Sequence, residues 1–325
     1  MRMMPPGVDL ALWAEASRLR EEYWGKNVYL RGIVEFSNHC RQNCLYCGLR
    51  RDNRELSRYC IDAEAIFSAA KAVKGLGFGT VVLQSGEDAG GDGEDVAKLI
   101  CRIKNKLNLA VTLSLGEREV ADYRLWREAG ADRYLLKLET LDEDLYARLR
   151  PGRKLAQRLH SLQELKDLGY ETGSGLIAGL PGERPGDLRR GLEFLAGLHL
   201  DMLSISPFTP APGTPFAEAL ACGLAEIFNA MALARVLMPT AHIPVTSALG
   251  LHGDDVRLAA LAVGDVLMPS LTPEAVRGAY AIYAGKNSGA ESPKARAEAM
   301  RDLLLNAGFA LPAGPGSAWR IERGS

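Results

Sequence analysis

The chain has 325 residues, is 47% hydrophobic and 24% charged, and carries a formal net charge of -1. This composition indicates an ordinary globular protein that can bury a large core, and it includes no basic stretch of the kind that binds nucleic acid. The N-terminal residues lack the apolar run of a secretory signal, and no run of about 18 apolar residues is present to span a bilayer. We therefore expect a cytoplasmic protein that binds neither nucleic acid nor membranes.

Strands and helices are predicted in alternation along the chain. An amphipathic helix at about 9–23 comes first, and short β-branched runs then alternate with longer helical patterns that end in glycine. The predicted strands are 28–36, 79–85, 109–115, 132–139, 173–179, 201–207, 243–248 and 263–269. Strand followed by helix, repeated in this way, predicts a complete parallel (β/α)8 barrel of the triosephosphate isomerase type, with an open doubly wound sheet as the alternative.

Two further helical patterns follow the last predicted strand, at 274–285 and 292–308. We expect them to form helical caps on the barrel. Proline, glycine and serine become frequent only at the extreme C-terminus, so the sequence shows no internal linker. The expectation is a single domain over 1–325, with the barrel at about 27–270 and the C-terminal cap at about 271–325.

Three cysteines lie close together in the segment CRQNCLYCGLR, directly after the first predicted strand. Cys40, Cys44 and Cys47 have the spacing C-x3-C-x2-C and make up half of the six cysteines in the chain. Loops that follow barrel strands converge on the mouth where the chemistry takes place. This crowding in a chain too large to need disulfides favours metal binding in a reducing compartment.

Two kinds of metal site fit three neighbouring thiolates. A structural zinc site needs a fourth ligand, which His39 or Cys60 would have to supply, although His39 is adjacent to Cys40 and its side chain diverges from it. A cubane 4Fe-4S cluster held by three cysteines instead leaves one iron open to a ligand that is not part of the protein. The second reading explains why there are three cysteines.

Polar side chains recur at alternate positions of several predicted strands. On the fourth strand, Arg133, Lys137 and Glu139 share one face, while the other face is apolar and should pack on helices. Similar polar positions on other strands are Gln84, Thr112, Ser114, Met202 with Ser204 and Ser206, and Thr246. Buried polar groups need partners, so this pattern predicts a polar ligand cavity; the alternative is an internal ion pair of Lys137 with Glu139 plus buried waters.

The cysteine spacing, with Tyr46 before the last cysteine, resembles the signature of the radical S-adenosylmethionine (SAM) superfamily. LQSGED after the second strand resembles the superfamily's GGE motif, in which Glu87 and the backbone would hold the methionine amino group of SAM. GLIAGLPG after the fifth strand resembles the G-x-I-x-G-x-x-G segment that packs near adenine. The resemblance implies a 4Fe-4S cluster that cleaves SAM reductively to a 5'-deoxyadenosyl radical.

Within this superfamily, residues 27–286 resemble the HydE maturases, which help to build the diiron site of iron-only hydrogenase. The resemblance implies that the three cysteines bind the cluster. It places Tyr46, Gln84, Glu87, Thr112, Ser114, Glu139, Arg158 and Met202 around SAM. It places Arg133, Thr246, Ser247, Tyr280 and Tyr283 at the substrate, with Thr112 and Lys137 also toward that end. The implied catalytic residues are Glu139, Lys137, Arg133 and Tyr280.

The implied substrate is a small organometallic or amino-acid-derived molecule, namely a cysteine-bound iron carbonyl cyanide precursor that receives the radical at sulfur. Transient contacts with other hydrogenase maturases and with an electron donor such as flavodoxin or ferredoxin are implied as well. The segment AGKNSGAESP lacks the second cysteine set of many HydE proteins, so no second cluster is expected. KLET replaces the RHET of some members, which keeps the charge but loses the planar fork of arginine and a histidine.

Other functions remain open on the sequence. Methylornithine synthase and biotin synthase share the barrel and the SAM motifs, but biotin synthase needs additional cysteines for a second cluster that are not evident here. Methylornithine synthase is therefore the alternative enzyme. From a different class, a zinc-stabilised barrel that acts as a binding protein is the alternative, and it predicts a colourless protein without affinity for SAM.

Overall fold

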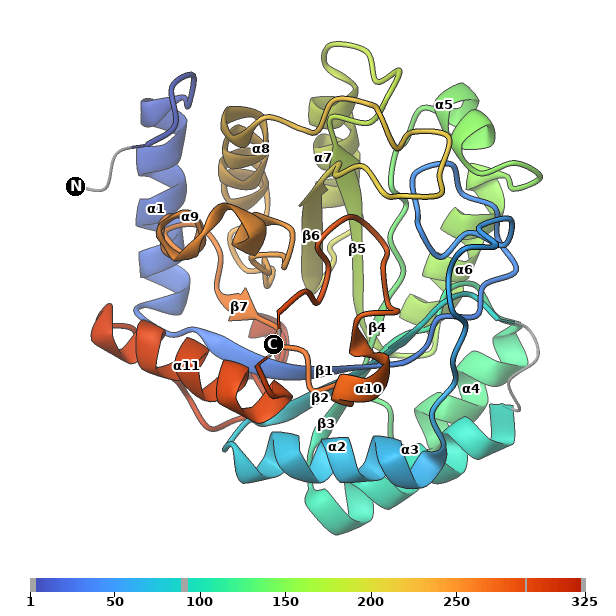
Figure 1. Ribbon diagram of the computed structural model, residues 1–325. Coiled ribbons are helices and arrows are strands. Elements are labelled where there is room, and N and C mark those ends of the chain that lie inside the picture. Colours follow the sequence, from blue (N-terminus) through green and yellow to red (C-terminus); the bar gives the residue numbers. More distant parts are fainter. Residues whose placement is uncertain (1–3, 89–92, 290, 323–325) are drawn as a thin grey trace.

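A curled parallel sheet forms the centre of the computed structural model, which describes residues 4–88, 93–289 and 291–322 (Figure 1). Within these ranges the sheet has seven strands in the order β6-β5-β4-β3-β2-β1-β7. The strands are β1 (Tyr29–Ser37), β2 (Thr80–Ser85), β3 (Ala110–Ser114), β4 (Arg133–Leu135), β5 (Glu171–Ala178), β6 (Met202–Pro207) and β7 (Val266–Leu267). All neighbouring pairs are parallel, so their carboxyl ends lie at one edge of the sheet.

Helices connect successive strands and cover the outer face of the sheet (Figure 1). The longer ones are α1 (Leu10–Trp24), α2 (Ala63–Gly75), α3 (Gly93–Leu107), α4 (Val120–Glu128), α6 (Leu155–Asp167), α7 (Asp187–Gly197), α8 (Leu224–Leu237) and α11 (Pro293–Asn306). The shorter ones are α5 (Glu143–Leu149), α9 (Asp254–Ala260), α10 (Glu274–Arg277), α12 (Trp319–Glu322) and the 3-10 helix η1 (Leu249–His252). The helix predicted at about 9–23 is α1, and its N-cap is the side chain of Asp9.

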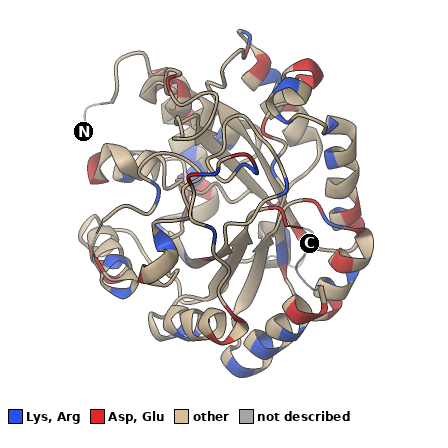
Figure 2. Cartoon of the chain, turned by 45° about the vertical axis from the view of Figure 1, so that its right-hand side comes forward, with Lys and Arg blue, Asp and Glu red and all other residues tan. Residues whose placement is uncertain are grey.

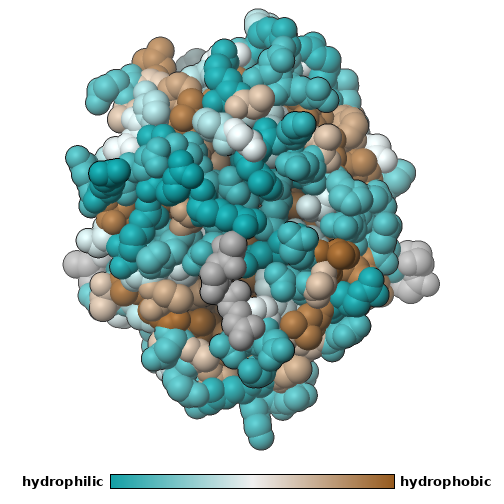
Figure 3. Space-filling model, turned by 90° about the vertical axis from the view of Figure 1, so that its right-hand side faces the viewer, coloured by the Kyte–Doolittle hydropathy of each residue, from teal (hydrophilic) through white to brown (hydrophobic). Residues whose placement is uncertain are grey.

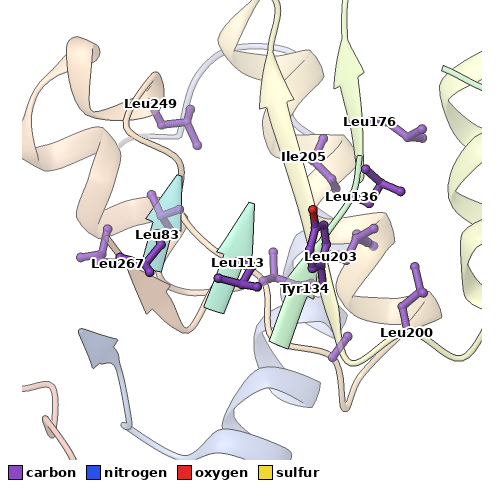
Figure 4. Packing of buried hydrophobic residues seen from close by; sticks show 14 of the residues in the cluster. Leu83, Leu113, Tyr134, Leu136, Leu176, Leu200, Leu203, Ile205, Leu249 and Leu267 are labelled. Carbon is purple, nitrogen blue, oxygen red and sulfur yellow. The ribbon is translucent and has the colours of Figure 1, made fainter. Parts of the chain in front are cut away.

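The main hydrophobic core lies between the outer face of the sheet and these helices (Figure 4). Leu83, Leu113, Tyr134 and Leu203 come from β2, β3, β4 and β6 and are buried there. They alternate along each strand with residues that point to the inner face, as a two-residue period requires. The predicted division of the fourth strand into an apolar outer face and a polar inner face is confirmed, because Tyr134, Leu136 and Leu138 are in the core.

The segment predicted as the seventh strand, 243–248, does not form a strand. The chain at 242–244 makes one parallel bridge on each side, from His242 to Met202 of β6 and from Pro244 to Val266 of β7. Pro244 has no N–H to donate, and the N–H of Ile243 donates to the Asp265 side chain at 2.7 Å. The structure therefore shows seven strands, and the chain at 242–244 makes one bridge to each of the two outer strands, β6 and β7. The complete eight-stranded barrel stays a prediction.

The residues after β7 are only partly helical. Of the helix predicted at 274–285, α10 ends at Arg277 and turns follow, whereas the helix predicted at 292–308 is present as α11. The segment 313–318 is not helical, and it contacts the first residues of the strands. At the amino ends of the strands the structure therefore shows a non-helical segment, and the predicted helical caps on a barrel stay a prediction.

Charged side chains of both signs are spread over the outer helices (Figure 2). The face in Figure 3 is mainly hydrophilic, with hydrophobic residues scattered among polar ones. Among the described residues no helix has the length and apolar character that a membrane crossing requires.

Candidate active site at the carboxyl ends of the strands

A cavity of about 300 Å³ lies at the carboxyl ends of the strands. Its walls come from the loop after β1, the ends of β2 to β6, and the segments 246–248 and 280–286. Among the residues named from the sequence, those that line it are Cys40, Cys44, Tyr46, Cys47, Gln84, Glu87, Ser114, Lys137, Glu139, Arg158, Thr246, Ser247, Tyr280 and Tyr283. The structure thus brings together residues that are up to 243 positions apart; their individual roles stay predictions.

The loop that carries the cysteines is held by side chains of its own segment. Arg58 donates to the carbonyl oxygens of Asn38 at 2.6 Å and Leu49 at 2.9 Å. Asn53 donates to the carbonyl of Gly48 at 2.8 Å. Because these are buried or half-buried hydrogen bonds, they fix the loop without using the thiols.

All three thiols face the cavity, and Cys44 is buried while Cys40 and Cys47 are half-buried. Burial raises the pKa of Cys40 and Cys47, and the neighbouring thiols raise it further. Deprotonation of these thiols therefore needs a positive partner, as a metal supplies. His39 and Cys60 are exposed and do not line the cavity.

A single ion would need ligands converging on one point. No such group of three or more His, Cys, Asp or Glu side chains occurs in the part of the chain that the structure describes. A cubane cluster uses one cysteine per iron and so spreads its ligands apart. Two buried oxygens in the cavity wall, Glu139 Oε2 and Thr246 Oγ1, have no hydrogen-bond partner and can accept or donate to a bound cofactor. The residues present thus fit a cluster with a polar ligand beside it.

Glu87 is buried and joins the turn after β2 to two arginines. Its carboxylate is 3.0 Å from Arg158 Nη1 and 3.6 Å from Arg150 Nη2, and it also accepts from Gln42. Burial would raise the pKa of Glu87, but Arg158 and Arg150 outweigh that effect and lower it. The carboxylate is therefore ionised, and it orients both guanidinium groups at the cavity wall.

Lys137 and Glu139 face each other inside the cavity. Lys137 Nζ is 3.1 Å from Glu139 Oε2 and donates to Ser206 at 3.2 Å. The ion-pair distance is short, but its geometry is not that of a hydrogen bond, which is why the same oxygen is also without a hydrogen-bond partner. Glu139 has a left-handed backbone with φ of 69°, a strained conformation that is found most often at functional sites.

The opposite wall of the cavity holds a second ion pair. Lys286 Nζ is 3.1 Å from Glu35 Oε1 and donates to Ser247 at 3.1 Å. Ser247 and Tyr283 share a hydrogen bond of 2.5 Å. Burial lowers the pKa of Lys286, but Glu35 more than offsets this and the pKa is raised, so the ammonium stays charged.

Three residues named from the sequence do not line the cavity. Arg133 is the first residue of β4, at the amino ends of the strands and away from the cavity, where its guanidinium binds Glu171 at 2.9 Å. Met202 is the first residue of β6, and its sulfur accepts from Arg31 at 3.3 Å. Thr112 lies mid-strand below the cavity. Alternation along a strand predicts which face of the sheet a residue lies on, but not how far along the strand it lies from the cavity. We therefore no longer assign substrate or SAM contacts to these three residues.

Sequence reasoning missed several cavity residues. Arg150 and Gln42 both contact Glu87, and Lys286 contacts Glu35. Gln42 lies within the cysteine segment, where its position between Cys40 and Cys44 was a usable signal. The pairing of Glu35 with Lys286 carries no local signal, because these residues are far apart in the chain.

Comparisons with known proteins agree with this geometry. Residues 34–195 match the family model of the radical SAM superfamily. The parallel fold, the cysteine loop and the cavity are those of a radical SAM enzyme. The chain belongs to the HydE family within that superfamily: it is 44% identical to the [FeFe] hydrogenase maturase subunit HydE of Thermotoga maritima over 281 residues, which is 86% of this chain and 80% of that protein.

Other relatives support the same class. The chain is 29% identical to 3-methylornithine synthase of Methanosarcina acetivorans over 267 residues, 81% of this chain and 74% of that protein. The crystal structure of methylornithine synthase (PylB) superposes with a TM-score of 0.83 at 25% identity, covering 93% of this chain and 88% of that one. HydG from Carboxydothermus hydrogenoformans has a TM-score of 0.77 at 19% identity, covering 93% of this chain and 72% of that one, and shows the fold alone.

Proposed function

We propose that this enzyme is a HydE-type maturase that delivers a SAM-derived radical to the sulfur of a cysteine-bound iron carbonyl cyanide precursor during assembly of the [FeFe]-hydrogenase site. The observation that carries the proposal is the meeting of Cys40, Cys44 and Cys47 with Glu87 and Lys137 in one cavity, in a chain 44% identical to a HydE protein. When bound, the 4Fe-4S cluster and SAM supply the 5'-deoxyadenosyl radical.

The residues of the cavity have distinct parts in this proposal. The three cysteines hold the cluster, and Arg158, kept in place by Glu87, presents a fixed positive charge at the cavity wall. Glu139, whose Oε2 is ion-paired with Lys137 but accepts no hydrogen bond, offers this oxygen to hydroxyl or amino groups of SAM. Tyr46, Gln84 and Ser114, which the resemblance to HydE proteins places around SAM, complete the part of the cavity wall that would bind SAM.

The wall formed by 246–248 and 280–286 is the substrate side of the proposal. Thr246, Ser247, Tyr280 and Tyr283 line it, and Lys286 holds the hydroxyl of Ser247. Preorganised donors of this kind orient a polar substrate at little entropic cost. Enclosure also keeps water and unwanted C–H bonds away from a reactive radical.

The proposal treats residues 1–325 as one domain in the cytoplasm, with the bridged segment 242–245 closing the barrel. An electron donor such as flavodoxin or ferredoxin reduces the cluster, and other hydrogenase maturases supply or receive the organometallic molecule. Support for the closed barrel comes from the bridges of His242 to β6 and of Pro244 to β7.

The test is anaerobic reconstitution with iron and sulfide, followed by reduction with SAM and a cysteine-bound iron carbonyl cyanide precursor. We expect a brown protein that forms an adenosyl-cysteine product. Cleavage of SAM without that product would overturn the substrate assignment, and formation of methylornithine from amino-acid substrates would favour the alternative enzyme, whose solved structure covers 93% of this chain. A colourless protein that takes up one zinc and no iron would overturn the whole proposal.

A further inference from the structure

The C-terminal segment enters the barrel at the end opposite the cavity. The carbonyl of Pro315 accepts hydrogen bonds from Thr80 at 2.7 Å and Arg133 at 3.2 Å. The carbonyl of Gly316 accepts from Arg133 at 3.1 Å and Arg31 at 3.0 Å. These partners are near the amino ends of β1, β2 and β4, so the segment spans several strands at once.

The next two residues continue the same contacts. The carbonyl oxygen of Ser317 is 3.1 Å from His242 Nε2, and the N–H of Ala318 donates to Glu171 at 2.7 Å. The residues of the segment thereby contact β1, β2, β4 and β5, and also His242 between β6 and β7. We call residues 315–318 the stopper.

The stopper supplies hydrogen-bond acceptors to the buried charges in this layer of the barrel. Arg31 and Arg133 are 3% and 0% exposed, and the carboxylate that binds Arg133 there is Glu171 at 2.9 Å. Burial and the neighbouring Arg133 lower the pKa of Arg31 to about 9. Buried charges need hydrogen-bond partners, and the carbonyl oxygens of the stopper provide them for both guanidinium groups.

A mainly apolar layer, with Thr112 beside Val82, separates the stopper from the cavity. Ile33, Val82, Leu135 and Met268 line the bottom of the cavity. Each lies two residues beyond a bottom-layer residue of the same strand or its extension, namely Arg31, Thr80, Arg133 and Val266. We call these four residues the floor.

The stopper is anchored on both sides. Before it, Ala310 pairs with the chain that leads into β1, through hydrogen bonds to Lys26 and from Val28 of 2.9 Å each. After it, the Trp319 ring packs edge-on against Tyr23 at 5.2 Å and Trp24 at 5.5 Å between ring centroids.

We propose that residues 315–318 are a built-in stopper that closes the amino end of the barrel, supplies hydrogen-bond acceptors to Arg31 and Arg133, and supports the floor that keeps water out of the radical cavity. The closure stands independently of the proposed reaction, whereas its effect on turnover rests on that reaction. The test therefore measures the two separately.

The first variant is Gly79→Ala, because a Cβ at Gly79 would overlap the carbonyl of Gly314 and push the stopper outward. The matched control is Gly314→Ala, where an added Cβ has no neighbour within 4 Å. Hydrogen–deuterium exchange of the N–H of Ala318 should rise at least about tenfold in Gly79→Ala and stay unchanged in Gly314→Ala, since one lost hydrogen bond corresponds to about that factor. Unchanged exchange in Gly79→Ala would overturn the closure.

A second variant guards against an indirect effect of Gly79 on β2. Gly316→Ala acts from within the stopper, since Gly316 has φ of 58° and its Cβ would meet the Tyr29 ring. Both variants should increase the amount of 5'-deoxyadenosine released per adenosylated product in the reconstituted enzyme, because buffer molecules that enter with the solvent would give the radical a hydrogen atom from a C–H bond and be left as carbon radicals themselves. Faster exchange with an unchanged product ratio would overturn the role in water exclusion, and absence of any adenosylated product in the unmodified enzyme would count against the proposed reaction alone.

Discussion

Individual cysteines of this chain differ in what their replacement would do. Cys40, Cys44 and Cys47 share the cavity, whereas Cys101 is exposed on α3 and its thiol lies 3.5 Å from the carbonyl of Ala129. A ligand cannot be replaced by water without opening a second iron, but an exposed helical cysteine has no such function. The chain thus contains its own control for the cluster assignment.

We expect Cys44→Ala to abolish SAM cleavage that depends on the cluster and to lower iron content after reconstitution. Cys101→Ala should match the unmodified protein in both respects. The measurement is iron per chain together with 5'-deoxyadenosine formed after reduction. Full cleavage by Cys44→Ala would refute the assignment.

Glu87→Ala should destabilise the fold as well as the site. Arg150 would be left buried without its carboxylate partner and Arg158 would keep only Glu117, at 3.5 Å; breaking a buried pair in this way typically costs about 3–5 kcal/mol of unfolding free energy. The measurement is urea unfolding of the protein without cofactors. Glu64→Ala, which breaks an exposed pair with Arg102, is the control and should leave the unfolding curve nearly unchanged. Equal losses in the two variants would show that the buried network is not a special source of stability.

The cysteine loop and the end of β2 are held together where their backbones come very close. Gly86 follows β2, and its N–H donates to Ser37 of β1 at 2.9 Å. A Cβ there would overlap the carbonyl of His39 and approach Cys40. The glycine of the turn is therefore needed because the cysteine loop packs directly on it.

Gly86→Ala should displace the cysteine loop from the end of β2 and cost about 1–3 kcal/mol, as overpacking usually does. Iron retention after reconstitution should fall as well, because the displaced loop carries the three cysteines. In Gly75→Ala, at the end of α2, the new Cβ meets nothing within 4 Å, so iron retention should be unaffected. Equal iron retention by both proteins would contradict the close packing.

The link between β6 and β7 depends on a buried charge network. Asp265 is fully buried and binds His242, Arg235 at 2.8 Å and the N–H of Ile243. Burial raises the pKa of Asp265, but His242 and Arg235 outweigh this and lower it from 3.8 to about 2. The segment that replaces the predicted seventh strand is thus held by side chains where strand pairing is incomplete.

A lowered pKa makes this network sensitive to acid. The stabilisation from Asp265 is present above pH 4 and is lost as the pH falls toward 2, because the unfolded chain binds the proton first. We expect a loss of about 2 kcal/mol of unfolding free energy over this range. Asp265→Asn should be less stable at neutral pH and should lack this part of the acid dependence. Parallel pH profiles for the two proteins would contradict the assignment.

At the scale of the molecule, local patterns and distant contacts were predictable to different degrees. Strand alternation and motif spacing follow from neighbouring residues, so the parallel fold and the cysteine loop could be predicted. The ion pair of Glu35 with Lys286 joins distant segments, and nothing local indicates it. Arg133 was placed at the substrate by the HydE resemblance, but it lies at the amino end of β4, where it contacts the C-terminal segment. The predicted seventh strand, 243–248, makes only single bridges, which was not foreseen because the N–H of Ile243 is taken by the side chain of Asp265.

The floor has a consequence for how such a protein can change over time. Ile33, Val82, Leu135 and Met268 separate a charged lower layer from a polar upper cavity. Residues that lie apart and share no partners contribute independently to stability. The loops at the mouth can therefore be exchanged to accept another substrate while the sealed lower half preserves the fold, so that one scaffold supports several radical chemistries without being rebuilt.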